Sequence, residues 1–403
     1  MTHSSPGLEV ADIVRSFGES FLALYGESLR SEHRRVLAAI EACRTPALGG
    51  HLYCCPRCGY EHPVYHSCRN RHCPKCQALA SARWVEQRAA ELLPVPYFHL
   101  VFTVPQELRP LFRRQPRQLY DLLFSTAAQT VLELAADNRH LGARTGLLAL
   151  LHSWTQTMLY HPHLHLVAPG GGLSLDGARW VGCRPDYFLP VQVLSRLFRG
   201  KLLAGLRELH AAGELDCSGP LEPLRDPRRF AGLLSPLYET GWVVYAKPPF
   251  GGPRQVLRYL ARYTHRIAIS NDRLLRLEGE QVVFTWRDRA DGDRVRTMRL
   301  HAHEFLRRFL LHVLPDGFVR IRSYGLLANR NRHETVARCR EVLGVPEEAA
   351  PPPPPEPLGW AELLARLTGT DPTRCPRCGA GLVLAAREIP AAGRGPPRLG
   401  AEP

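Results

Sequence analysis

The sequence predicts an α+β fold, and three observations support this prediction. Segments with the apolar spacing of helices are mixed with short apolar runs typical of strands. They do not follow the regular strand–helix–strand rhythm of a doubly wound parallel sheet. Of the 403 residues, 45% are hydrophobic, so the chain can bury a sizeable core and has room for more than one domain.

The elements follow from these patterns in chain order. Helical spacing of apolar residues is found over 8–44, 106–138 and 253–266, and in a stretch that ends near 213 before a polar loop. The apolar runs of strand length are YFHLVFTVP (97–105), TGLLALLHSW (145–154), LYHPHLHLVAPGGG (159–172), GWVVYAKPP (241–249) and QVVFTWRDR (281–289). The last two strands flank the helix predicted over 253–266, which has a proline in its first turn.

The charge of the chain favours a polyanionic partner. Lys and Arg number 52 against 38 Asp and Glu, which gives a net charge of +14 and a pI near 9.5. Nucleic acid is preferred over a membrane because no basic amphipathic segment stands out. The alternative is a soluble basic protein with no such partner.

The cysteine content indicates a reducing compartment. The start of the chain lacks a secretory signal, and no run of about 18 apolar residues suggests a transmembrane helix. Twelve cysteines in such a chain more often bind metal than form disulfides. We therefore expect a cytoplasmic protein.

Two C-x-x-C pairs predict a zinc site. Cys55 and Cys58 are separated from Cys73 and Cys76 by fourteen residues, a spacing suited to a closed tetrahedral site for structural Zn²⁺. Four further residues nearby could bind metal: Cys54, His66, Cys68 and His72. One of them could replace a cysteine of the two C-x-x-C pairs, or Cys68 could support a second site. The same loops carry four cations, Arg57, Arg69, Arg71 and Lys75. These side chains either face the phosphates of a nucleic acid or form a solvated rim.

A further pair, Cys375 and Cys378, supplies only half a site. It is either a remnant or is completed by Cys339 or by another chain, and the sequence assigns it no role.

Three histidines alternate in the stretch 159–172. His161, His163 and His165 lie on one face if this stretch is a strand, so two or three imidazoles could hold one metal ion. The alternative is a half-buried strand whose imidazoles bond to the backbone.

Two tyrosines share a face of the helix predicted over 253–266. Tyr259 and Tyr263 are four residues apart, a spacing that most often reflects core packing. The residues around them are unusually basic: Arg258, Arg262, His265 and Arg266. Positive charge favours the phenolate, which suits attack on a phosphodiester.

Several motifs together carry a family resemblance. They are, in order, CRTPALGGHLYCCPRCG, SCRNRHCPKCQ, YFHLVFTVP, HPHLHLVAPGGG, KPPFGGP, YLARYTHRIAISN and FVRIRSYGLLANR. From about residue 40 to 333 the chain resembles the HUH endonuclease superfamily, and more closely the rolling-circle transposases of the insertion-sequence ninety-one family. The resemblance implies a helical segment and zinc-binding domain over 1–90. It also implies an HUH-like catalytic domain over 95–335, with a central antiparallel β-sheet flanked by helices. A proline-rich linker (346–358) and a short tail (359–403) depart from the family pattern.

The resemblance also implies roles for individual residues. His163 and His165 would be the metal-binding HUH pair for Mg²⁺ or Mn²⁺, and Tyr259 and Tyr263 the paired nucleophiles. A third ligand is expected, for which we favour His265 over His161. Attack would leave a 5′-phosphotyrosyl link and a free 3′-hydroxyl on single-stranded or hairpin DNA at the ends of a mobile element.

Other functions use parts of the same pattern. A relaxase or a rolling-circle replication initiator would share the active site, and a non-catalytic zinc protein that binds DNA would use these residues in its core. The absence of a G-x-x-x-x-G-K-[ST] motif agrees with strand transfer that needs no ATP. Aromatic candidates for stacking on bases are Trp154, Trp286 and Tyr324, although core packing is the commoner role of such residues.

Overall fold

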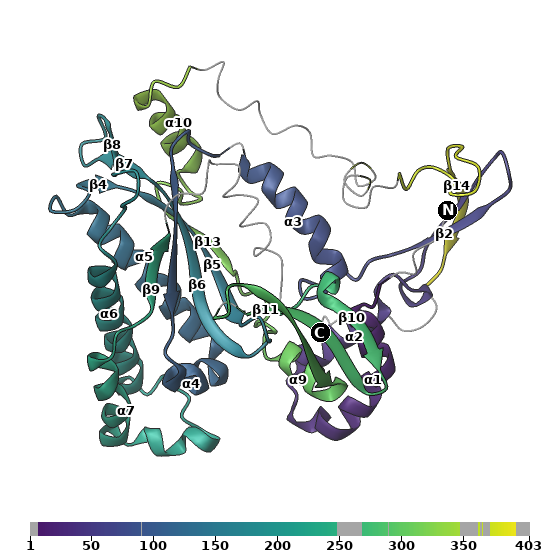
Figure 1. Ribbon diagram of the computed structural model, residues 1–403, viewed down its shortest axis with the longest axis horizontal. Helices are drawn as coiled ribbons and strands as arrows, with labels where there is room; N and C mark the ends of the chain where they lie inside the picture. Colours follow the sequence, from purple (N-terminus) through teal and green to yellow (C-terminus); the bar gives the residue numbers. More distant parts are fainter. Residues whose placement is uncertain are drawn as a thin grey trace, which may run out of the picture.

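The computed structural model describes residues 7–89, 91–247, 268–288, 290–346, 362, 365 and 371–391. It confirms the α+β class, with a five-stranded antiparallel sheet at its centre (Figure 1). The strands in sheet order are β13 (Ile321–Gly325), β5 (Gly146–Trp154), β6 (Tyr160–Pro169), β3 (Tyr97–Thr103) and β9 (Val244–Lys247). All five strand regions predicted from the sequence are confirmed, four of them in this sheet and the fifth as β11 (Gln281–Asp288).

The two faces of the central sheet differ, because successive side chains of a strand point to opposite sides. On one face, Leu164, Leu166 and Ala168 of β6 join the main core. Four helices cover this face (Figure 1), namely α4 (Arg109–Arg114), α5 (Pro116–Ala136), α6 (Val191–Ala211) and α7 (Pro227–Glu239). The histidines of β6 alternate with these apolar residues and therefore belong to the opposite face.

Helix α7 corrects the polar loop predicted after residue 213. Asp226 caps the helix by accepting a hydrogen bond from the Arg228 N–H, and Pro227 stands at the first helical position. Phe230 and Leu234 anchor the helix in the main core. The helix was missed because most of its residues are polar or small and only a narrow stripe, Phe230, Leu234 and Leu237, is buried.

A second lobe is built from distant parts of the chain. The predicted N-terminal helices, confirmed as α1 (Val10–Tyr25) and α2 (Ser31–Ala42), share a core with α9 (Ala302–Leu310) and with the sheet of β10 (Leu274–Glu278), β11 and β12 (Arg294–His301). Phe21 and Ile40 are fully buried there beside Phe284 and Phe305.

A third, smaller sheet lies far from the central one, at the right of Figure 1. It consists of β1 (Gly50–Cys54), β2 (Glu61–Tyr65) and β14 (Val383–Ile389). Helix α3 (Pro74–Ala89) runs from this side of the molecule toward the central sheet. β14 belongs to the C-terminal tail and pairs with β1, so the tail returns to the N-terminal part of the chain.

Two remaining groups complete the described structure. β4 (Ala143–Arg144), β7 (Gly171–Ser174) and β8 (Trp180–Gly182) form a small sheet after β6. Helix α10 (Arg332–Val342) packs with Leu150 and Val167 on the histidine face of the central sheet.

The described part of the chain contains no helix long and apolar enough to cross a membrane. The helix predicted over 253–266 and most of the predicted linker lie outside the described residues.

Candidate active site

Three histidines converge on the face of the central sheet that is opposite helices α4 to α7. His163 and His165 are two apart on β6, and His152 of β5 is the cross-strand neighbour of His163. One ring nitrogen of each lies within 4.8 Å of the others, and the Nε2 atoms of His163 and His165 are 3.1 Å apart. Two nitrogens bound at right angles, about 2.1 Å from one ion, would be about 3 Å apart. The group therefore fits a divalent metal ion.

Hydrogen bonds at the Nδ1 atoms orient the two rings of β6. Nδ1 of His163 is 2.7 Å from the backbone carbonyl of His161. A carbonyl only accepts, so this Nδ1 carries the proton and Nε2 keeps a lone pair. Nδ1 of His165 is 2.7 Å from Nε2 of His99 on β3, and the two rings are stacked. When Nδ1 of His165 donates to His99, its Nε2 is also in the form that binds metal.

The third member of the group is His152, a residue that the sequence did not single out. His161, although it lies on β6, is not among the three described histidines that converge. Its Nδ1 accepts a hydrogen bond of 2.6 Å from Arg109, and burial, together with the Arg109 charge, lowers its pKa to about 4. The favoured ligand His265 lies outside the described residues, as do Tyr259 and Tyr263. His152 stands in an apolar run with no motif, so only the pairing register of β5 and β6 could have identified it.

The histidines line a cavity of about 380 Å³. Trp154, which stacks on His152 with ring centroids 4.5 Å apart, and Trp286 of β11 also line it. Tyr324 packs half-buried against the main core instead. Of the three aromatic candidates, the two tryptophans reach the cavity, where Arg287 adds a cation.

The cysteines form two groups, which corrects the single site predicted from Cys55, Cys58, Cys73 and Cys76. One group consists of Cys43, Cys68, Cys73 and Cys76, and the other of Cys55, Cys58, Cys375 and Cys378. The β1–β2 hairpin separates the two predicted pairs, because the first pair is at its tip and the second follows its base. A five-residue strand is about 17 Å long, too far for one ion to bridge.

The first cysteine group joins α2 to α3. Cys43 is the C-terminal cap of α2, while Cys73 and Cys76 flank the start of α3. The sulfur atoms are 3.6–3.7 Å apart in three pairs, close to the separation of about 3.8 Å expected for tetrahedral zinc with bonds of about 2.3 Å. Hydrogen bonding from Cys68 lowers the pKa of Cys43 to about 7, which favours the thiolate form. Cys43 carries no C-x-x-C signature, so the spacing alone did not reveal it.

The surplus residues of this region have other roles. Nε2 of His72 accepts a hydrogen bond of 3.1 Å from the Leu314 N–H, so the ring joins the cysteine loop to a residue of the main core. Lys75 forms an ion pair of 2.5 Å with Glu9. Cys54 belongs to neither cysteine group.

Comparisons with known proteins agree with this organisation. Residues 146–334 match a family model described as "Putative transposase", and residues 13–104 match one described as "Transposase zinc-binding domain". The chain is 48% identical over 398 residues to the "Putative transposase y4qJ" of Sinorhizobium fredii, with 99% of each chain covered. It is 30% identical over 375 residues to the transposase for insertion sequence element IS801 of Pseudomonas savastanoi pv. phaseolicola, covering 89% of this chain and 84% of that protein. No solved structure matches the chain. The zinc-binding family model and the cysteine groups together support structural zinc.

Proposed function

The chain belongs to the insertion-sequence ninety-one family of transposases, and from this premise we propose that it cuts and rejoins single-stranded DNA at the ends of a mobile element. The reaction would use 5′-phosphotyrosine intermediates and support rolling-circle transposition. The observation that carries the proposal is the group of His152, His163 and His165 in a cavity large enough for a nucleotide. The net charge of +14 suits a DNA substrate.

The fold of the catalytic region supports an HUH-type assignment. The histidine pair stands on an inner strand of an antiparallel sheet whose other face is covered by helices. The three imidazoles would hold Mn²⁺ or Mg²⁺, and such an ion polarises a non-bridging oxygen of the scissile phosphate. Nitrogen donors favour Mn²⁺ of the two, because Mg²⁺ prefers oxygen ligands.

The nucleophile in this proposal is the phenol of Tyr259 or Tyr263. Its oxygen attacks the phosphorus and loses its proton, and the bond from phosphorus to the 3′ oxygen breaks to leave a 3′-hydroxyl. The energy of the broken ester is kept in the new one, so a 3′-hydroxyl can reverse the step without ATP. Chain order supports this assignment, because Tyr245 of β9 lines the cavity and the tyrosine segment follows β9.

A cleavage assay tests the proposal. Labelled single-stranded oligonucleotides that carry the ends of the element should be nicked in Mn²⁺, and EDTA should stop the reaction reversibly. His163→Ala and His165→Ala should still bind the oligonucleotide but should not nick it. Nicking that survives EDTA, or that persists in either variant, would contradict a metal-dependent role of the histidines.

A further inference from the structure

We propose that a second zinc ion is held jointly by both ends of the chain, in a site made of Cys55, Cys58, Cys375 and Cys378. The four sulfur atoms lie within 4.8 Å of one another. Cys375 and Cys378 lie outside the segments 13–104 and 146–334 that match family models. The site would fasten the C-terminal tail to the zinc-binding domain, a role separate from DNA cleavage.

The two halves of this site are built alike. The pentapeptide Cys-Pro-Arg-Cys-Gly occurs at 55–59 and again at 375–379. In each copy the glycine N–H donates to the carbonyl of the first cysteine, at 2.9 Å in both. Gly59 and Gly379 have φ values of +67° and +72°, a conformation that glycine adopts without steric cost. Each copy is thus a turn that presents two cysteines, and the repeat is the sequence signal that pairs them.

The sulfur geometry fits zinc better than a disulfide. Sγ of Cys55 is 3.4 Å from that of Cys378, and Sγ of Cys58 is 3.7 Å from that of Cys375. A disulfide would need about 2.05 Å, whereas sulfurs around tetrahedral zinc are about 3.8 Å apart. All four cysteines are free of disulfide bonds.

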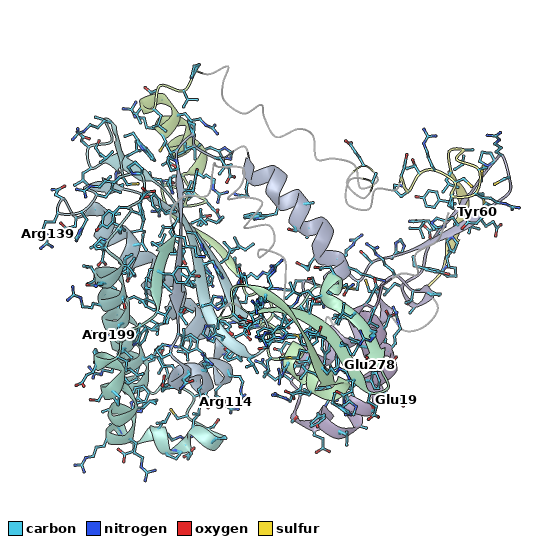
Figure 2. The ribbon with its side chains drawn as sticks, viewed as in Figure 1. Glu19, Tyr60, Arg114, Arg139, Arg199 and Glu278 are labelled. Carbon is cyan, nitrogen blue, oxygen red and sulfur yellow. The ribbon has the colours of Figure 1, made fainter. Side chains whose placement is uncertain are left out.

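Strand pairing brings the two halves together. β14 follows the second turn and pairs antiparallel with β1, which precedes the first turn, so that Cys54 is opposite Val383 (Figure 1). Tyr60, next to the first turn, is labelled within this small sheet in Figure 2. Cys339, the partner considered from the sequence, is instead a buried residue of α10, on the side of the helix that packs against the central sheet. The tail therefore contributes half of a metal site to a domain that begins more than 300 residues earlier.

Such a site constrains the chain strongly. A metal clip that closes a long loop removes more conformational freedom from the unfolded chain than one that closes a short loop. The ligands are far apart in sequence, so the ion binds only when the tail has docked, and loss of zinc should release the tail.

The zinc content of purified variants tests the proposal. In a His163→Ala background, which keeps the histidine centre from contributing, we expect two zinc ions per chain by elemental analysis. Cys375→Ser or Cys378→Ser should contain one, whereas the matched control Cys54→Ser should keep two. An unchanged zinc content in both tail variants would overturn the proposal, and so would a single zinc ion in the background protein.

A cleavable linker tests the tether directly. A protease site inserted among the prolines at 351–355 would allow the intact protein to be cut after folding. The two fragments should elute together in size-exclusion chromatography and separate after a zinc chelator is added. Fragments that separate in the presence of zinc, or that stay together after zinc is removed, would show that the ion does not hold the tail.

Discussion

The proton positions on individual imidazoles decide what the histidine centre can bind. His163 donates through Nδ1 to a backbone carbonyl, which leaves a lone pair on its Nε2. The Nε2 of His165 lies 3.1 Å from that atom, and its Nδ1 is paired with His99. His161, only two residues away, uses its Nδ1 to accept from Arg109. Identical residues on the same face of one strand therefore have different roles, set by their hydrogen-bond partners.

The first prediction concerns the third metal ligand. His152→Ala should abolish nicking and weaken Mn²⁺ binding, because it removes one of three converging nitrogens. His161→Ala should retain Mn²⁺ affinity within a few fold, because the Nδ1 of His161 already accepts from Arg109. Mn²⁺ titration followed by electron paramagnetic resonance would measure this directly. If His152→Ala bound Mn²⁺ normally and His265→Ala bound it weakly, the third ligand would be His265, as the sequence favoured.

The second prediction concerns pH and His312. This ring is buried between the Ser153 hydroxyl and the Met158 carbonyl, and burial lowers its pKa to about 4. The unfolded chain, with an ordinary pKa near 6.5, binds the proton more readily, so the free energy of unfolding should fall as pH drops from about 6.5 to 4. The slope is at most about 1.4 kcal/mol per pH unit for this group, or about 2 kcal/mol by pH 5.

Urea denaturation at pH 7 and pH 5 measures this effect. His312→Gln should have a shallower pH dependence than the wild type, and His140→Gln, at an exposed position, should keep the wild-type dependence. Equal pH dependence in all three proteins would contradict a buried neutral His312.

At the scale of elements, the sequence predicted local structure better than pairing. Four of the five strands of the central sheet were identified because apolar residues alternate or run together, for example in YFHLVFTVP, which forms β3. β13 was missed, because its sequence IRSYG has no apolar run. The register that puts His152 beside His163 and the hairpin that separates Cys58 from Cys73 depend on how two consecutive strands pair, which the apolar pattern within one strand does not encode. Cys375 and Cys378 were read as half a site because the pairing of β14 with β1 could not be predicted from the sequence.

The third prediction concerns the glycines that follow β6. A Cβ on Gly172 would lie 2.2 Å from the backbone oxygen of Arg144, because β7 runs close beside β4. Gly172→Ala should therefore destabilise the protein by about 1–3 kcal/mol. Gly182→Ala on β8, where a Cβ meets no atom within 4 Å, is the matched control and should change stability little. Equal thermal midpoints for the two variants would mean that the backbones can move apart at no cost.

At the scale of the whole molecule, residues from two lobes meet at the histidine cavity. The central sheet supplies the histidines, the second lobe contributes Trp286 and Arg287 to the cavity, and the small zinc-binding sheet extends away from both (Figure 1). The labelled Arg139 and Arg199 lie along the helical side of the molecule in Figure 2.

The fourth prediction is a strong dependence of DNA affinity on salt. If about six phosphates are neutralised, affinity for single-stranded DNA should fall roughly 300-fold between 50 and 200 mM salt. His163→Ala should have the same slope, since its neutral imidazole contributes no counterion release. Fluorescence anisotropy with a labelled oligonucleotide measures both, and a salt-independent affinity would rule out phosphate contacts as the main source of binding.

Detection of the covalent intermediate tests the central claim most directly. Wild-type protein, a single-stranded oligonucleotide with an element end, and Mn²⁺ should give a protein–DNA adduct on a denaturing gel that retains a 3′ label and not a 5′ label. Tyr259→Phe combined with Tyr263→Phe removes only two hydroxyls and should give no adduct while DNA binding persists. An adduct in the double variant, or one that carries the 5′ label, would contradict cleavage by these tyrosines through a 5′-phosphotyrosine link.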